Sequence, residues 1–233
     1  MFGKIDFQVE PLGDRAILLT CHSTSDAQAL AQALQKLSPA GMENMVVAYH
    51  SVAVHINRHY TSIVRIISDI KNLQPAPLAS LSKVHYIPCC YEIGEDLETV
   101  ASKLHLTRNQ VIDLHCKSTF TIYAIGFSPG FPYMGWLPEE LQGIPRRKEP
   151  RLKVPAGSVA IAGKQTAIYP QSTPGGWALI GRTPKVLVDI HAGYFPLSVG
   201  DQVIFQPISA REFQTIIGSL ETSQIRQVTT LQA

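Results

Sequence analysis

The sequence predicts an α+β N-terminal domain over residues 1–82, followed by a mainly β domain over residues 83–233. Three observations lead to this fold class. Before residue 75, strand-like apolar runs alternate with amphipathic helical patterns. The segment PAPLAS at 75–80 has the composition of a linker. After residue 118, short β-type runs alternate with turns rich in glycine and proline, as in a β-barrel or sandwich.

The first elements are two strand-like runs and a helix between them. DRAILLT at 14–20 and MVVAYHSVAVHI at 45–56 have strand-like composition, and the second run is long enough to divide near His50. Ser25 and Gln28 are spaced as a capping box for the helix. Its expected apolar face consists of Leu30, Ala33, Leu34 and Leu37.

A second amphipathic helix is predicted over about 60–73, followed by a strand at 83–87. The apolar stripe of this helix consists of Ile63, Ile66, Ile67, Ile70 and Leu73.

Residues 96–117 predict two short capped helices. Asp96 can cap the first, and Thr107 with Gln110 forms a capping box for the second. The residues expected to be buried are Leu97, Val100, Ala101 and Leu104, then Val111, Ile112 and Leu114. A DNA-binding helix-turn-helix needs more base-contacting donors and phosphate-contacting cations than this segment offers. Packing on a sheet is therefore the favoured interpretation.

The later part of the chain contains six β-type runs, which are TFTIYAIGF, SVAIAG, TAIYP, WALIG, KVLVDI and DQVIFQPI. The segment GFSPGFPYMGW at 126–136 overlaps the end of the first. Its prolines and glycines specify a rigid loop, and its aromatic side chains must be buried or face a partner.

Composition and charge exclude several classes of function. Hydrophobic residues make up 45% and charged residues 16%, which is typical of a globular chain. A net charge of +2 gives no general case for binding nucleic acid or a membrane surface. Since we find neither a signal-peptide pattern nor a long apolar run, we expect a cytoplasmic protein.

The cysteines predict neither disulfides nor a metal site in this chain. Four irregularly spaced cysteines are expected to be reduced. The potential ligands His85, Cys89, Cys90, His115 and Cys116 lack the spacing of a metal-binding motif. A nucleophilic Cys–His pair at Cys116 stays open, because such partners meet in space.

Two familiar catalytic motifs are rejected. GSVAIAGKQT at 157–166 has the wrong glycine spacing for a phosphate-binding loop, and glutamine follows its lysine. Ser128 is not a nucleophile elbow, because Pro129 removes the backbone amide required there.

An anion site is predicted on the β domain. RRKEPRLK at 146–153 has five cations against one acid, next to turns expected to be rigid. Arg147 and Arg151 lie in this run, and Arg182 is a further cation. Guanidinium groups pair with carboxylate or phosphate through two parallel hydrogen bonds.

GFSPGFPYMGWLP (126–138) and the stretch from IPRRKEPRLK to ALIGRTP (144–184) closely resemble the allophanate hydrolase subunit 1 family, also called the sporulation-kinase inhibitor family. Its bacterial members include the B subunit of the ATP-dependent 5-oxoprolinase. The resemblance is specific over about 85–207 and collinear before that. It implies a cyclophilin-like β-barrel as the second domain and supplies no catalytic residue. The substrate pocket that it implies consists of Phe127, Pro129, Phe131, Arg147, Arg151, Gln165 and Arg182.

The resemblance also implies a function. The chain would be one subunit of a hydrolase that uses ATP to convert 5-oxo-L-proline to L-glutamate, with partners that resemble the A and C subunits of 5-oxoprolinase. Whether the isolated chain has activity is open. A first alternative is an inhibitor that binds a sensor histidine kinase, as the family's older name suggests. A second is a component of a urea/allophanate or biotin-dependent carboxylation system.

Overall fold

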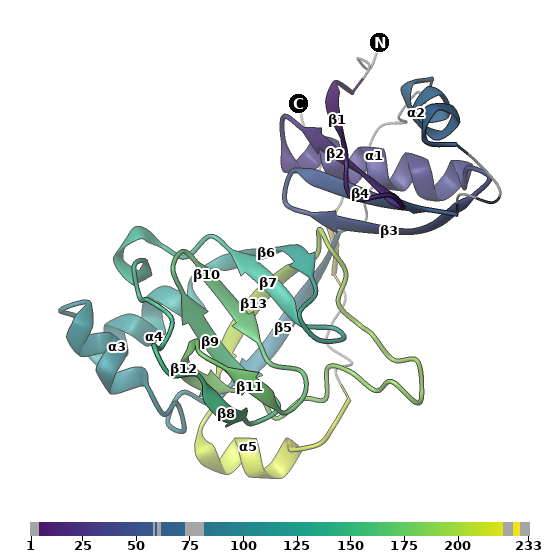
Figure 1. The fold of residues 1–233 in the computed structure, drawn as a ribbon. Helices are drawn as coiled ribbons and strands as arrows, with labels where there is room; N and C mark the ends of the chain where they lie inside the picture. Colours follow the sequence, from purple (N-terminus) through teal and green to yellow (C-terminus); the bar gives the residue numbers. More distant parts are fainter. Residues whose placement is uncertain (1–4, 58, 60–61, 73–81, 221–225, 229–233) are drawn as a thin grey trace. The chain divides into compact units, whose positions relative to one another are not determined.

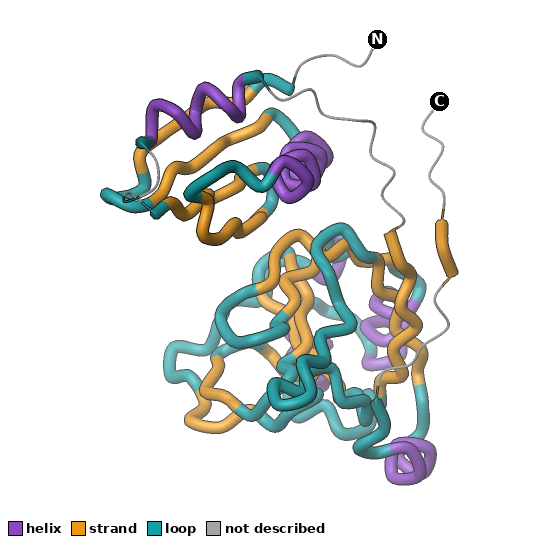
Figure 2. The backbone as a smooth tube through the Cα atoms, turned by 90° about the vertical axis from the view of Figure 1, so that its right-hand side faces the viewer, coloured by secondary structure: helices purple, strands orange, loops and turns teal. Residues whose placement is uncertain are grey.

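The computed structural model describes residues 5–57, 59, 62–72, 82–220 and 226–228. The chain forms two compact units, Met1–Ser80 and Leu81–Ala233, shown in two views in Figures 1 and 2. The predicted boundary at 82/83 stays a prediction, because the segment 73–81 lies outside the described residues.

Unit 1 is an antiparallel sheet with two helices. The strands are β1 (Phe7–Pro11), β2 (Ala16–Cys21), β3 (Met42–Ala48) and β4 (Ser51–Ile56), in the order β1-β2-β4-β3. The helices are α1 (Thr24–Leu37) and α2 (Ile63–Lys71). The predicted run at 45–56 does divide, and its turn places Tyr49 at a φ of 54°. Alternate side chains of β2 and β4, such as Ile17 and Val54, form a core with the buried faces of the helices.

The start of α1 differs from the prediction. Ser23, not Ser25, is the cap: its backbone is extended and its hydroxyl accepts a hydrogen bond from Asp26 N at 3.1 Å. This shift gives the helix a buried face of Ala27, Leu30, Ala31 and Leu34. Leu37, predicted to be on that face, is 47% exposed. In α2, Ile66 and Ile70 are buried as predicted. Leu73, predicted for the same stripe, lies outside the described residues.

Unit 2 is mostly antiparallel sheet with a few helices (Figure 1). Its strands are β5 (Ser82–Cys89), β6 (Thr119–Ile125), β7 (Pro132–Gly135), β8 (Arg151–Val154), β9 (Ser158–Ala162), β10 (Gln165–Ile168), β11 (Thr173–Gly175), β12 (Ala178–Arg182), β13 (Gln202–Pro207) and β14 (Arg226–Val228). The helices are α3 (Leu97–Lys103), α4 (Arg108–Cys116), α5 (Ala210–Ile216) and a 3-10 turn (Glu139–Leu141).

The main sheet of unit 2 closes on itself. Its strands follow the order β5-β13-β6-β7-β10-β9-β12, with β13 parallel to β5. Cys90 and Arg182 then exchange two backbone hydrogen bonds, of 2.8 and 3.0 Å, which join the ends of β5 and β12. A short β8-β11 ribbon is separate from this barrel. The cyclophilin-like assignment itself stays a prediction.

The two faces of the barrel strands pack into different clusters. On β9, Val159 and Ile161 point into the barrel core, whereas Ala160 and Ala162 belong to a second cluster. Because side chains alternate along a strand, this second cluster lies on the outer face. It contains Val154 of β8, so the ribbon packs over it.

Three predictions for unit 2 have clear outcomes. The Thr107–Gln110 capping box of α4 is confirmed. KVLVDI at 185–190 is not a strand, because its backbone makes only isolated bridges from Val186 and Asp189. The predicted loop at 126–136 contains strand β7, so part of that segment belongs to the barrel wall.

None of the described helices is long and apolar enough to cross a membrane. Within the same residues, we find no group of three or more His, Cys, Asp or Glu side chains that could hold a metal ion. The cysteines are free thiols.

Candidate functional site

Five aromatic side chains form a connected group on the outer face of the barrel, which we call the aromatic cluster. Its members are Phe127, Phe131, Tyr133, Tyr169 and Trp177. Phe131 is its centre, with ring centroids 4.9 Å from Tyr133, 5.1 Å from Tyr169 and 6.0 Å from Trp177. These contacts are edge to face, the favoured arrangement for aromatic pairs.

Small residues let the cluster pack closely on the sheet. Ala160 and Ala167 are fully buried beneath it. Gly175 is required where β11 passes Tyr169, because a Cβ there would overlap the tyrosine hydroxyl. The cluster is thus a fixed platform.

Phe127 is the exposed member of the aromatic cluster. It is 64% exposed, although its ring still contacts Phe131 at 5.3 Å between centroids. Its φ of 67° lies in the left-handed region, which costs a residue with a side chain about 1–2 kcal/mol. The strained backbone and the exposed ring make Phe127 a candidate for contact with a ligand.

Three arginines lie beside the aromatic cluster, and we call them the arginine group: Arg146, Arg147 and Arg151. The guanidinium of Arg146 lies 5.8 Å from the ring centre of Trp177. The backbone of Arg147 donates to Gly176 O at 2.7 Å, which ties the basic segment to the residue before Trp177. Burial raises the pKa of Tyr169, and the nearby charges of Arg146 and Arg151 oppose that increase.

Asp96 links the arginine group to the barrel. Arg151 Nη2 donates to both carboxylate oxygens of Asp96, at 2.8 and 2.9 Å, and Leu179 N donates to Oδ2 at 2.7 Å. Arg147 Nη1 lies 3.7 Å from Oδ1, and Arg151 Nε lies 3.4 Å from Glu95. Burial alone would lower the pKa of Arg151, but its contacts with the two carboxylates raise it overall.

The prediction that Asp96 caps α3 is right in position but wrong in role. Asp96 occupies the N-cap position of α3 but makes no side-chain capping hydrogen bond. Its backbone, with a ψ of 2°, is not in the extended conformation of an N-cap. Its carboxylate faces the arginines instead.

Comparison with known proteins places this chain. A family model for the carboxyltransferase domain, subdomain C and D, matches residues 7–195. The chain belongs to the carboxyltransferase domain family.

Family members similar to this chain include named subunits of 5-oxoprolinase. The B subunit of 5-oxoprolinase from Bacillus subtilis (strain 168) is 34% identical over 231 residues, which cover 90% of this chain and 96% of that protein. The protein of the same name from Escherichia coli O157:H7 is 50% identical over 115 residues, covering 49% of this chain and 52% of that protein. These relatives confirm the resemblance found in the sequence.

Solved structures in the comparison include longer chains. The crystal structure of TTHA0988 has a TM-score of 0.77 at 36% identity, covering 84% of this chain and 41% of that chain. The Kluyveromyces lactis urea carboxylase has a TM-score of 0.70 at 18% identity, covering 95% of this chain and 24% of that chain. The second likeness shows a shared fold only.

Four of the predicted pocket residues lie in the aromatic cluster or the arginine group. Phe127 and Phe131 belong to the aromatic cluster, and Arg147 and Arg151 belong to the arginine group. Phe131, however, is 1% exposed, so it supports the platform from within and does not form an open wall.

The other three predicted residues lie in the loop after Phe127 (Pro129), at the first position of β10 (Gln165) and at the last position of β12 (Arg182). Pro129 is exposed in the loop after Phe127. Gln165 starts β10, opposite Gly135, whereas Tyr169 follows the other end of that strand. Arg182 donates from Nε to Ala156 O at 2.7 Å, and its guanidinium lies over Phe213 at 5.8 Å.

Sequence reasoning missed four residues of the site: Asp96, Arg146, Tyr169 and Trp177. Arg146 belongs to the basic run at 146–153, Tyr169 lies within the strand-like run TAIYP, and Trp177 begins the run WALIG. No local pattern connects Asp96 to an arginine 55 positions later.

A second set of hydrogen-bonded polar side chains lies inside the barrel, where its members bind one another. His115 is fully buried, with Nδ1 2.7 Å from the Tyr91 hydroxyl and Nε2 3.0 Å from the Thr166 hydroxyl. The thiol of Cys116 donates to the same tyrosine oxygen at 3.3 Å, and burial raises the pKa of that thiol. Cys116 therefore pairs with a tyrosine and not with a histidine, which argues against an activated nucleophile.

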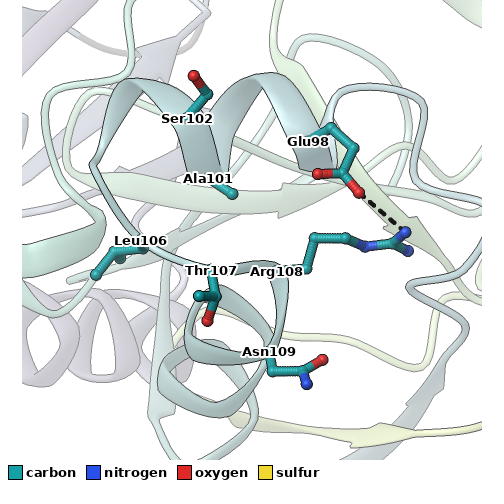
Figure 3. Close-up of a pocket in the computed structure, with 7 residues that line it drawn as sticks. All are labelled: Glu98, Ala101, Ser102, Leu106, Thr107, Arg108 and Asn109. Carbon is teal, nitrogen blue, oxygen red and sulfur yellow. Dashed lines mark ion pairs between the residues drawn. The ribbon is translucent and has the colours of Figure 1, made fainter.

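A cavity of about 500 Å³ lies between α3 and α4 (Figure 3). It is lined by Glu98, Ala101, Ser102, Leu106, Thr107, Arg108 and Asn109, none of which belongs to the predicted pocket. Glu98 and Arg108 form an ion pair of 3.0 Å across it, and Thr107 caps α4. The two charged groups are thus already paired with each other, and we place the candidate site at the aromatic cluster and arginine group.

Proposed function

We propose that this chain is a cytoplasmic subunit of an ATP-dependent 5-oxoprolinase complex, which converts 5-oxo-L-proline to L-glutamate with partners similar to the A and C subunits of that enzyme. The match to the B subunit of 5-oxoprolinase from Bacillus subtilis, over 96% of its length, carries the proposal. We also propose that residues 83–233 form a cyclophilin-like barrel domain that holds the substrate site.

The chemistry of the candidate site fits the substrate. 5-Oxoproline is a small ring that bears one carboxylate and one lactam amide. A guanidinium can bind the carboxylate through two hydrogen bonds, and the exposed ring of Phe127 can cover the apolar face of the lactam. Arg147, which is 48% exposed, is the arginine best placed to receive the carboxylate.

The ATP requirement has a chemical reason. A lactam carbonyl is a poor electrophile, so water opens the ring slowly. Transfer of the terminal phosphoryl group of ATP to the amide oxygen, releasing ADP, produces an activated imidate. Addition of one water to its carbon and cleavage of the carbon–nitrogen bond give an acyl phosphate with a free amine. A second water hydrolyses this acyl phosphate to glutamate and phosphate. In this scheme our chain binds and orients the substrate, and the complex as a whole uses ATP.

The proposal is tested by reconstituting the three proteins and measuring glutamate and ADP formation. Omission of this chain is expected to abolish coupled turnover. Arg147→Ala is expected to raise the KM for 5-oxoproline at least about tenfold, the effect of losing a charge-assisted hydrogen bond. Arg211→Ala, which removes an exposed arginine from α5, is the matched control. Full activity without this chain would contradict the proposal.

A second candidate function is a role in urea/allophanate or biotin-dependent carboxylation. It is favoured by the family model and by a relative from Emericella nidulans with the name "Putative urea carboxylase", which is 25% identical over 135 residues. Bicarbonate- and urea-dependent ATP hydrolysis by the reconstituted complex would support it. Inhibition of a histidine kinase stays a prediction, and loss of kinase autophosphorylation on addition of this chain is its test.

A further inference from the structure

Asp96 is the residue on which the arginine group converges. Its Oδ1 accepts from Arg151, and its Oδ2 accepts from both Arg151 and the backbone of Leu179. The side chain of Asp96 is 13% exposed and that of Arg151 is 16% exposed. Buried, charge-assisted contacts of this kind hold both groups in a single geometry.

Arg147 is attracted to Asp96 without being hydrogen-bonded to it. The separation of 3.7 Å exceeds hydrogen-bonding distance, while the like charge of Arg151 lies on the same carboxylate. Among the described residues, Arg147 has no other acidic partner. Its guanidinium is therefore oriented by Asp96 and keeps its donors for a further acceptor.

The charge balance of the site suits an anion. Arg146, Arg147 and Arg151 contribute three positive charges, and Asp96 and Glu95 contribute two negative charges. Among the exposed neighbours in the same run, Lys148 and Glu149 cancel each other, and Lys153 adds one further positive charge. The net positive charge of the site complements an anionic ligand.

We propose that Asp96 is a positioning residue: it fixes Arg151 and aims Arg147, so that Arg147 binds the single carboxylate of the substrate. This inference rests on the proposed function, since it takes 5-oxoproline as the ligand. Asp96 does not touch the substrate. It acts through Arg147, and this dependence can be measured.

The test is Asp96→Asn in the reconstituted complex, with 5-oxoproline varied. Asparagine keeps an oxygen for the amide of Leu179 but loses the charge that orients the arginines. The carboxylate of the substrate is not a reacting group, so we expect its binding to affect the ground state and the transition state equally. We expect the KM for 5-oxoproline to rise about tenfold and kcat to stay within about threefold.

Asp113→Asn is the matched control, because Asp113 is an exposed aspartate paired with Lys117 on α4. Its KM should remain within about twofold of the native value. The decisive comparison is the double variant with Arg147→Ala. If Asp96 acts through Arg147, Asp96→Asn adds less than about a twofold change in KM once Arg147 is absent.

The outcomes separate the two proposals. An unchanged KM in Asp96→Asn, or a full additional increase in the Arg147→Ala background, overturns the positioning role while turnover by the native complex upholds the proposed function. No turnover by the native complex overturns both. If Asp96→Asn folds poorly, Asp96→Glu replaces it in the same comparison of single and double variants. Glutamate keeps the charge but moves it by one methylene.

Discussion

At the scale of single residues, the hydrogen bonds around His115 inside the barrel determine which group donates and which accepts in each pair. The Thr166 hydroxyl donates to Ala160 O at 3.1 Å, so it accepts from Nε2–H of His115. Nδ1 of His115 must then accept from the Tyr91 hydroxyl, which in turn accepts from Cys116. This order assigns a neutral histidine with its proton on Nε2.

The neutral state of His115 predicts a pH dependence of stability. Burial lowers its pKa from 6.5 to about 3. Below pH 6.5 the unfolded chain takes up a proton that the folded protein excludes. The free energy of unfolding therefore decreases as the pH is lowered, and it levels off below pH 3. On lowering the pH from 7 to 4.5, this histidine should decrease the free energy of unfolding by about 2–3 kcal/mol.

Urea unfolding of the native protein and of His115→Gln, measured across that pH range, checks the prediction. The variant is expected to be less stable at pH 7, because glutamine cannot replace the ring between Phe120 and Phe205. Its stability should nevertheless depend less steeply on pH. Parallel pH curves for the two proteins would show that His115 does not titrate as argued.

Individual site residues were predictable only in part. The basic run containing Arg147 and Arg151 was visible, because five cations in eight positions stand out in a chain of low charge. Asp96 was noticed for the wrong role, since local spacing suggested a helix cap. Its bond to Arg151 depends on how β8 and β12 pack, which no window of sequence contains.

At the scale of secondary-structure elements, the N-cap of α1 can be tested by replacing each of two nearby serines with alanine. Ser23→Ala should destabilise the protein by about 1 kcal/mol, because the amide of Asp26 loses its acceptor. Ser25→Ala should cost clearly less, although Ser25 contacts the Ser23 hydroxyl at 2.8 Å. Thermal unfolding monitored by far-UV circular dichroism measures both. A larger effect at Ser25 would favour the cap expected from sequence.

Elements with local chemical signals were the ones that sequence predicted well. The Thr107–Gln110 box marks α4 because both partners lie within one helical turn. KVLVDI was misassigned because its Leu187 and Val188 are buried without strand pairing. Strand β7 was missed because its pairing with β6 and β10 overrides the glycine and proline content around it.

At the scale of the whole molecule, the hydrophobic clusters predict that unit 2 folds by itself. The core of unit 1 and the two clusters of unit 2 share no member. A fragment of residues 81–233 should therefore unfold cooperatively. Both tryptophans, Trp136 and Trp177, lie in it, so tryptophan fluorescence reports on unit 2 alone.

A core variant of unit 1 provides the control in the full chain. Ile56→Ala should destabilise unit 1 by about 2–5 kcal/mol, because Ile56 is fully buried. The transition followed by tryptophan fluorescence should not move. A fragment without a cooperative transition, or a fluorescence transition shifted by Ile56→Ala, would show that the units depend on each other.

Closure of the barrel has a consequence for biosynthesis. Strand β5, at the beginning of unit 2, pairs with β13 and β14, which lie near the end of the chain. The first strand of this unit to leave the ribosome must therefore wait, unpaired, for nearly all of the remaining polypeptide. Such non-local pairing slows folding and exposes apolar strands meanwhile. We therefore expect the newly made β5 to be prone to aggregation until β13 has been synthesised.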